Sequence, residues 1–166
     1  RVVVLDHPLI DHKLSVLRNE ITPSSVFRQT VHEITLLECY EATKHLITKE
    51  VEVKTPLATC VCKSIAKQEP VIVPILRAGL AMLDAMPSAP VAHLGMYRDE
   101  TTHKPIEYYA KMPGYIAERQ VLLVDPMLAT GGSICAALHA LRNRGVKDIT
   151  IMVIVAAPEG IRTVLD

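Results

Sequence analysis

The segment from residue 121 to residue 133 constrains the fold more strongly than any other part of the chain. Four apolar residues lead to the acid Asp125, a turn with two glycines follows, and a helical pattern begins at Ser133. A buried strand that turns sharply into a helix is a building unit of an open α/β sheet. Ligands of such sheets bind at the carboxyl ends of the strands, which is the position of Asp125.

The same alternation of apolar strands and helical segments extends along the chain. The patterns predict strands over 2–5, 70–76, 91–97, 106–112, 121–125 and 148–157. They predict helices over 7–19, 23–40, 56–67, 80–86 and 133–144, and a last helical turn from residue 158. Pro74 indicates an edge strand or a bend, because proline donates no ladder hydrogen bond. We therefore expect an α/β domain with a mostly parallel sheet.

Composition supports this fold class. The chain has 166 residues, a length that suits one domain. Hydrophobic residues make up 49% and aromatic residues only 4%, so the core must be largely aliphatic. An aliphatic core is typical of buried parallel strands packed against helices.

Charge, apolar runs and cysteines exclude several classes of protein. Eighteen basic residues balance eighteen acidic ones, so neither nucleic acid nor an anionic membrane is expected as the main partner. The longest apolar run, 149–157, is too short to span a bilayer. One residue separates Cys60 from Cys62, which is not the spacing of a zinc or redox motif. We expect reduced thiols in a cytoplasmic protein.

The turn before the predicted helix at Ser133 has the components of a phosphate site. Gly131 and Gly132 permit positive φ and let backbone N–H groups approach an anion. Thr130 and Ser133 add hydroxyl donors, and the helix directs its first N–H groups to the same place. The turn is not a Walker A loop, because Gly132 stands where lysine is required, and adjacent glycines do not fit the dinucleotide fingerprint.

Asp125 narrows the ligand of this turn. A carboxylate beside a phosphate would repel it, so Asp125 should face sugar hydroxyls or a hydrated cation. A ribose 5-phosphate meets both requirements, with its phosphate in the turn and its 2- and 3-hydroxyls on Asp125. The alternative is a capped helix whose glycine turn binds nothing.

The stretch Asp-Pro-Met-Leu-Ala-Thr-Gly-Gly-Ser from Asp125 to Ser133 resembles the phosphoribosyl diphosphate signature of type I phosphoribosyltransferases. Most members carry two successive acids, whereas Pro126 follows Asp125 here, as in the version found in uracil phosphoribosyltransferases. The segments around Arg77, Arg98 and 156–160 extend the likeness over nearly the whole chain. The resemblance implies a mostly parallel central sheet flanked by helices, with a β-hairpin arm near the active site.

The resemblance also implies a set of site residues. Asp125 and Arg77 are the expected catalytic residues. Phosphoribosyl diphosphate is expected to contact Arg77, Arg98, Asp125, Pro126, Met127, Leu128, Ala129, Thr130, Gly131, Gly132 and Ser133. On sequence alone, either arginine could instead be a solvated charge in a turn. The polar segment 99–105 should form the arm, and we assign His103 within it no catalytic role, since a lone loop histidine is usually solvated.

The implied reaction joins uracil to the phosphoribosyl group and releases diphosphate, giving UMP in pyrimidine salvage. Mg²⁺ would be carried by the diphosphate, with Asp125 reaching it through water and no protein residue as a direct ligand. The family likeness further implies a homo-oligomer, a dimer or larger, and a GTP effector. Neither nucleic acid nor a membrane is expected as a partner.

The family's uracil-recognition segment lies well beyond residue 160, so we interpret 1–166 as a single phosphoribosyltransferase domain that lacks it. The uracil-binding residues are therefore unknown. Three alternatives stay open: a phosphoribosyltransferase for another base, a non-catalytic phosphoribosyl-binding regulator that binds RNA, and a structural α/β domain with an empty loop.

Overall fold

The apolar segments pair into a central five-stranded sheet in the computed structural model, which describes residues 1–102 and 105–166. In spatial order its strands are β5 (Pro105–Lys111), β4 (His93–Arg98), β3 (Val71–Leu76), β6 (Val121–Val124) and β8 (Ile149–Met152). β3 is parallel to β4 and β6, β6 is parallel to β8, and β5 is antiparallel to β4. The predicted mostly parallel sheet is confirmed.

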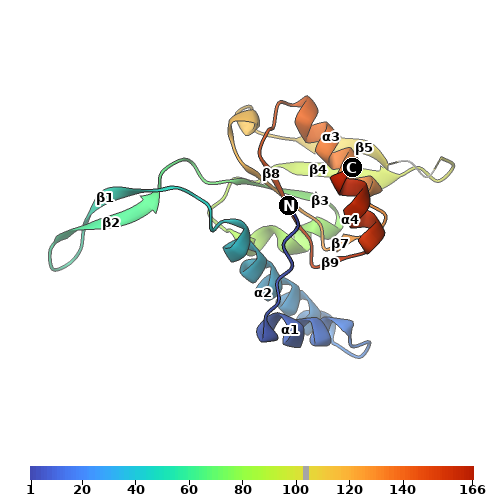
Figure 1. Cartoon of the computed structure of the whole chain (residues 1–166), viewed down its shortest axis with the longest axis horizontal. Coiled ribbons are helices and arrows are strands. Elements are labelled where there is room, and N and C mark those ends of the chain that lie inside the picture. The colour runs from blue at the N-terminus through green and yellow to red at the C-terminus, as the bar shows by residue number, and fades with distance from the viewer. Residues whose placement is uncertain (103–104) are drawn as a thin grey trace.

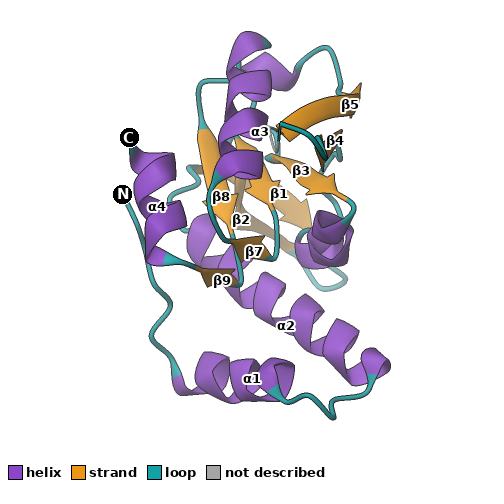
Figure 2. Cartoon of the chain, turned by 90° about the vertical axis from the view of Figure 1, so that its right-hand side faces the viewer, coloured by secondary structure: helices purple, strands orange, loops and turns teal. Residues whose placement is uncertain are grey.

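Alternating side chains of the central strands build two cores, one on each face of the sheet. Val73 and Leu123 pack with Ile134 of α3 (Gly132–Asn143) on one face. Ile72 and Leu122 pack on the other face against α2 (Ser24–Ala42) and the 3₁₀ segment η1 (Ala78–Ala85). Figure 2 shows α3 and α2 on opposite sides of the sheet. Burial on both faces explains why these strands read as continuous apolar runs.

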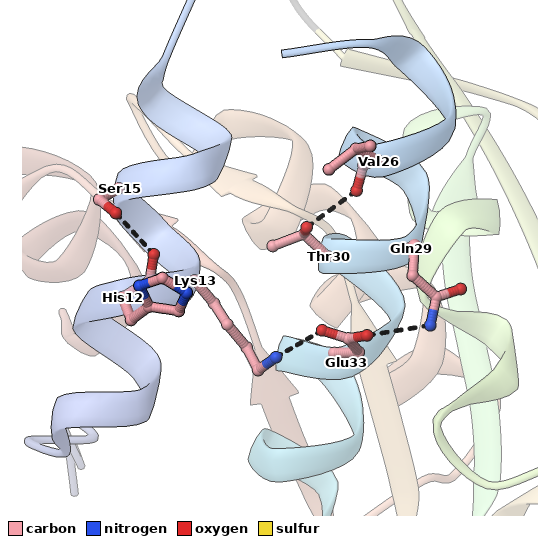
Figure 3. A network of polar contacts seen from close by, with 7 residues as sticks. All are labelled: His12, Lys13, Ser15, Val26, Gln29, Thr30 and Glu33. Carbon is pink, nitrogen blue, oxygen red and sulfur yellow. Dashed lines mark hydrogen bonds and ion pairs between the residues drawn. The ribbon is translucent and has the colours of Figure 1, made fainter.

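The first helix, α1 (Pro8–Arg18), packs on the outer side of α2. Lys13 of α1 forms an ion pair with Glu33 of α2, and Gln29 Nε2 donates a 3.0 Å hydrogen bond to Glu33 Oε1 (Figure 3). Among the described residues, no helix combines the length and the apolar character needed to cross a membrane.

The strand predicted over 148–157 is divided in two. After β8 the chain leaves the central sheet and forms β9 (Val155–Ala156), which pairs in parallel with β7 (Met127–Leu128). Ile154 N and Val155 N both donate to the carbonyl oxygen of Pro126, at 3.1 and 3.2 Å. α4 (Pro158–Leu165) follows directly, and the short 3₁₀ segment η2 (Ile116–Glu118) precedes β6.

The helix predicted over 56–67 is wrong. β1 (Thr48–Lys54) and β2 (Thr59–Ile65) form an antiparallel hairpin there, which projects from the body of the molecule (Figure 1). Thr55 Oγ1 accepts hydrogen bonds from the backbone N–H groups of Leu57 and Ala58, so Thr-Pro begins a tight turn rather than a helix.

The strand predicted over 2–5 does not form. Of the two alternatives for Pro74, an edge strand or a bend, the edge strand is wrong. Pro74 lies not at an edge but in β3, which has β4 on one side and β6 on the other. On the β6 side, Pro74 pairs with Val124. On the other side of β3, Ile72 forms an isolated bridge, and regular pairing with β4 begins only at Ile75. The partner of Ile72 in that bridge is Val91, which precedes β4, so Pro74 has no ladder partner on this side and its missing N–H is accommodated.

The predicted hairpin arm is confirmed as the antiparallel pair of β4 and β5. Tyr97 and Tyr108 face each other across the pair, with ring centroids 6.1 Å apart. Asp99 Oδ1 accepts hydrogen bonds from the backbone N–H groups of Thr101 and Thr102, which begins the turn. His103 lies outside the described residues.

Glu38 of α2 is a half-buried residue whose carboxylate has an unusual environment. Its Oε2 atom is buried and has no hydrogen-bond partner within the described residues. Burial raises the pKa of Glu38 to about 7. Because the folded state disfavours the charged form, Glu38 destabilises the fold increasingly as the pH rises from the ordinary value of 4.5 to about 7.

We predict that Glu38→Gln is more stable than the wild type above pH 7, by roughly 3 kcal/mol at most, since one pKa unit corresponds to about 1.4 kcal/mol. The difference should shrink towards pH 5. Urea denaturation of both proteins at pH 5, 6, 7 and 8 measures it, with the exposed Glu20→Gln as control. A difference that stays constant with pH would contradict the assignment.

Candidate active site

Three polar residues stand at the carboxyl ends of neighbouring parallel strands. Arg98 ends β4, Arg77 follows β3 and Asp125 follows β6. Because the strand order is β4, β3, β6, all three residues lie along one edge of the sheet. This is the edge where open α/β sheets bind ligands.

The turn after β3 brings Arg77 close to the end of β6. A Cβ on Gly79 would lie 2.6 Å from the carbonyl oxygen of Val124, so only glycine allows η1 to pack this tightly. Leu80 N donates a 3.1 Å hydrogen bond to Arg77 O, and the peptide bond between Leu76 and Arg77 is cis. The Arg77 side chain itself is exposed.

The turn from residue 126 to residue 132, called the phosphate loop from here on, has a positive φ at one of the two glycines for which it was predicted. Gly131 has a φ of 91°, in the left-handed region that favours glycine, and it is the N-cap of α3. Cys135 N donates a 2.9 Å hydrogen bond to Gly131 O, which starts the helix. Arg98 Nη2 lies 3.4 Å from Thr130 Oγ1, so the hairpin arm contacts the loop.

A small pocket of about 80 Å³ lies at this edge. Its lining residues are Arg98, Asp125, Met127, Leu128, Ala129, Thr130, Gly131, Gly132, Ser133 and Ile134. Nine of the eleven predicted site residues therefore come together, and Arg77 and Pro126 do not line the pocket. Ile134 was missed, because its apolar side chain reads as core in the helical pattern of α3, and it is indeed buried.

Asp125 is half-buried, and burial raises the pKa of its carboxyl group. A hydrogen bond from Met127 N to Asp125 Oδ1, at 3.4 Å, acts in the opposite direction and lowers the pKa. The bond also fixes the carboxylate at the start of the loop.

A larger cavity of about 400 Å³ lies between α1 and α2. Its lining contains no strand end and no glycine turn, and its cation Lys13 is paired with Glu33. The chemistry for anion binding is therefore concentrated in the smaller pocket at the sheet edge.

The pocket offers a single carboxylate to a divalent cation. Asp125 is the carboxylate among its lining residues, and the described residues hold no cluster of three or more His, Cys, Asp or Glu side chains that could cage a metal. One carboxylate suits a Mg²⁺ ion that takes its other ligands from water and from a bound diphosphate.

A solved structure shares the fold. A hypoxanthine-guanine phosphoribosyltransferase from Bacillus anthracis superposes with a TM-score of 0.55 over 80% of this chain and 70% of that chain, at 8% identity. The architecture is therefore that of type I phosphoribosyltransferases, with the glycine turn at its ligand edge.

The family model described as uracil phosphoribosyltransferase matches residues 4–166, and the chain belongs to that family. A uracil phosphoribosyltransferase of Thermoanaerobacter sp. is 54% identical over 98% of this chain and 80% of its own length. One from Clostridium beijerinckii is 52% identical over 99% and 80%. The solved AQ2163 protein from Aquifex aeolicus is 36% identical, with a TM-score of 0.88 over 98% of this chain and 79% of its own.

We predict that Gly131→Val destabilises the fold by more than about 1–2 kcal/mol, the cost of left-handed backbone in an ordinary residue. A Cβ at Gly131 would also lie 3.0 Å from Thr163 Cβ. The variant should lose binding of ribose 5-phosphate. Calorimetry and thermal denaturation measure both effects.

Gly132→Ala is the matched control for stability. Its φ is not in the left-handed region, and a Cβ there would approach no atom closer than 4.0 Å. Equal melting temperatures for Gly131→Val and Gly132→Ala would refute the geometry assigned to Gly131.

Proposed function

We propose that the chain transfers the phosphoribosyl group of 5-phosphoribosyl 1-diphosphate to uracil, giving UMP and diphosphate. The observation that carries the proposal is that the residues from Asp125 to Ser133, Pro126 excepted, line one pocket at the end of β6. Family membership supports the choice of uracil as the base.

The phosphate loop holds the 5-phosphate. Backbone N–H groups around Gly131 and Gly132 and the hydroxyls of Thr130 and Ser133 are the donors available in the pocket. The N-terminal end of α3 adds its positive dipole. The contacts of this phosphate, distant from the reacting bond, supply binding energy for the donor in the ground state and the transition state alike.

Asp125 binds the ribose hydroxyls. Its carboxylate lies at the start of the loop, where it accepts hydrogen bonds and, as an anion, stabilises positive charge that develops on the ribose in the transition state. Its partial burial strengthens that electrostatic effect, because less water screens it.

Arg77 and Arg98 neutralise the diphosphate. Both stand at the same sheet edge as Asp125, and Arg98 already contacts the loop through Thr130. Mg²⁺, when bound with the diphosphate, would supply further positive charge to the leaving group, and Asp125 would help to hold it through water. No nucleophilic side chain is needed, since N1 of the base attacks C1 directly. Closure of the β4–β5 arm would exclude water.

We further propose that residues 1–166 form a single phosphoribosyltransferase domain and that the protein is cytoplasmic. We also propose that it forms a homo-oligomer and that GTP is an effector. The exposed side chains of Leu57 and Val61 on the β1–β2 hairpin are apolar surface that an oligomer could cover.

Diphosphate release by the full-length protein tests the function. With phosphoribosyl diphosphate and Mg²⁺, uracil should support release, and cytosine, adenine, guanine and hypoxanthine should not. Release with another base alone would identify a different transferase. RNA binding without any release would identify a regulator, and no ribose-phosphate binding at all would leave a structural domain.

We predict that Asp125→Asn lowers kcat on the order of 100-fold or more, because a preorganised charge is lost. The amide still accepts the Met127 hydrogen bond, so the fold is kept. Since burial raises the Asp125 pKa, the charged form destabilises the fold at neutral pH, and the variant should melt higher than the wild type at pH 7. This gain should vanish near pH 4. An active or less stable variant at pH 7 would contradict the role.

We predict that Arg77→Ala also lowers kcat by about 100-fold, since the departing diphosphate loses a cation. Arg77 is exposed, so the melting temperature should change little. Arg142→Ala is the control, because Arg142 lies in the last turn of α3, at the opposite end from the loop. Steady-state kinetics decide the point: full activity of Arg77→Ala would remove it from the mechanism.

A further inference from the structure

Residues 154–163 contact the phosphate loop at several points along its length. The contacts between the loop and residues 154–163 follow in sequence order along both segments. Pro126 O accepts from Ile154 N and Val155 N, and β7 then pairs with β9. Ala157 N donates a 2.8 Å hydrogen bond to Leu128 O, which ends the strand-like part. The loop is therefore paired in parallel with the chain that leads into α4.

The contact continues into α4, where it changes from hydrogen bonds to close packing. Gly160 is buried, and a Cβ on it would collide with the carbonyl oxygen of Ala129 and lie 3.0 Å from Leu128 Cγ. The helix and the loop backbone thus touch directly, which any side chain at position 160 would prevent.

One turn further along α4, Thr163 packs against Gly131. A Cβ on Gly131 would lie 3.0 Å from Thr163 Cβ and 3.1 Å from its Cγ2 methyl. Thr163 Oγ1 donates within its own helix to Glu159 O, so the methyl, not the hydroxyl, faces the loop. Thr163 O lies 3.6 Å from Cys135 Sγ, which links α4 to α3 as well.

α4 is itself fixed to the body of the protein. Ile161 and Val164 pack against the core on the α3 side of the sheet. The helix therefore has two functions in packing: one face anchors it in the core, and Gly160 and Thr163 contact the loop. Figure 2 shows β7 and β9 side by side, with α4 directly after β9.

We propose that Gly160 and Thr163 are positioning residues for phosphoribosyl diphosphate, acting through the phosphate loop. They touch no substrate. They hold Ala129 and Gly131 in the conformation that directs backbone N–H groups at the 5-phosphate. The proposal rests on the proposed function, and it locates part of the donor affinity in a helix outside the pocket.

The effect should appear in KM more than in kcat. The 5-phosphate is bound equally in the ground state and the transition state, so a displaced loop weakens both to the same extent. Gly160→Ala should raise KM for phosphoribosyl diphosphate about tenfold or more, with kcat changed much less. Gly114→Ala is the control, because nothing lies within 4 Å of a Cβ there.

A second pair of variants separates positioning from folding, in case Gly160→Ala folds poorly. Thr163→Val keeps the methyl that faces Gly131 and removes the hydroxyl, whereas Thr163→Ser does the reverse. Thr163→Ser should raise KM for phosphoribosyl diphosphate about two- to threefold, the scale of one partly buried methyl. Thr163→Val should match the wild type.

Kinetics of the full-length protein and calorimetric binding of ribose 5-phosphate measure the outcome. Weaker sugar-phosphate binding in Gly160→Ala and Thr163→Ser, but not in Thr163→Val, supports the proposal. Lower melting temperatures with unchanged KM and binding would overturn it, leaving a purely structural helix. Failure of the wild type to release diphosphate would instead refute the proposed function, so the two failures are distinguishable.

Discussion

The site depends on one backbone constraint: between β6 and α3 the chain must reverse direction with its N–H groups exposed to an anion. Gly131, at a φ of 91°, makes that turn possible. Much of the surrounding structure supports it. β9 pairs with the start of the loop, α4 packs against its middle, and α3 begins at its end. Asp125 stands just before the turn, where we propose that it binds the sugar of a phosphate held in the loop.

The order of the strands places charged side chains from neighbouring strands beside this turn, as a large, highly charged substrate would require. β3 lies between β4 and β6, so their carboxyl ends bring two arginines and one aspartate to a single edge. The glycine at position 79 allows the turn after β3 to pack onto the end of β6. In the proposed mechanism, groups from separate strands stabilise the charge on the donor diphosphate and the charge that develops on the ribose.

The parts of the fold and of the site that depend on local sequence patterns alone could be predicted. The run Val121–Val124 and the glycine turn determined the strand, the loop and the start of α3, because each is a short-range signal. The helix predicted over 56–67 failed because Thr55 and Pro56 suit a turn as well as a helix start, and only pairing between β1 and β2 decides between them. Tertiary pairing likewise places Pro74 in a central strand. The contact of Gly160 with Ala129 joins residues distant in sequence, so no local pattern reveals it.

We propose that the phosphate loop, and not the larger cavity between α1 and α2, binds the phosphoribosyl group. Amide chemical shifts of the ¹⁵N-labelled full-length protein, titrated with ribose 5-phosphate, test it directly. The largest shift changes should fall on Ala129, Thr130, Gly131, Gly132 and Ser133. Changes confined to residues of α1 and α2, with those five amides unmoved, would contradict the account.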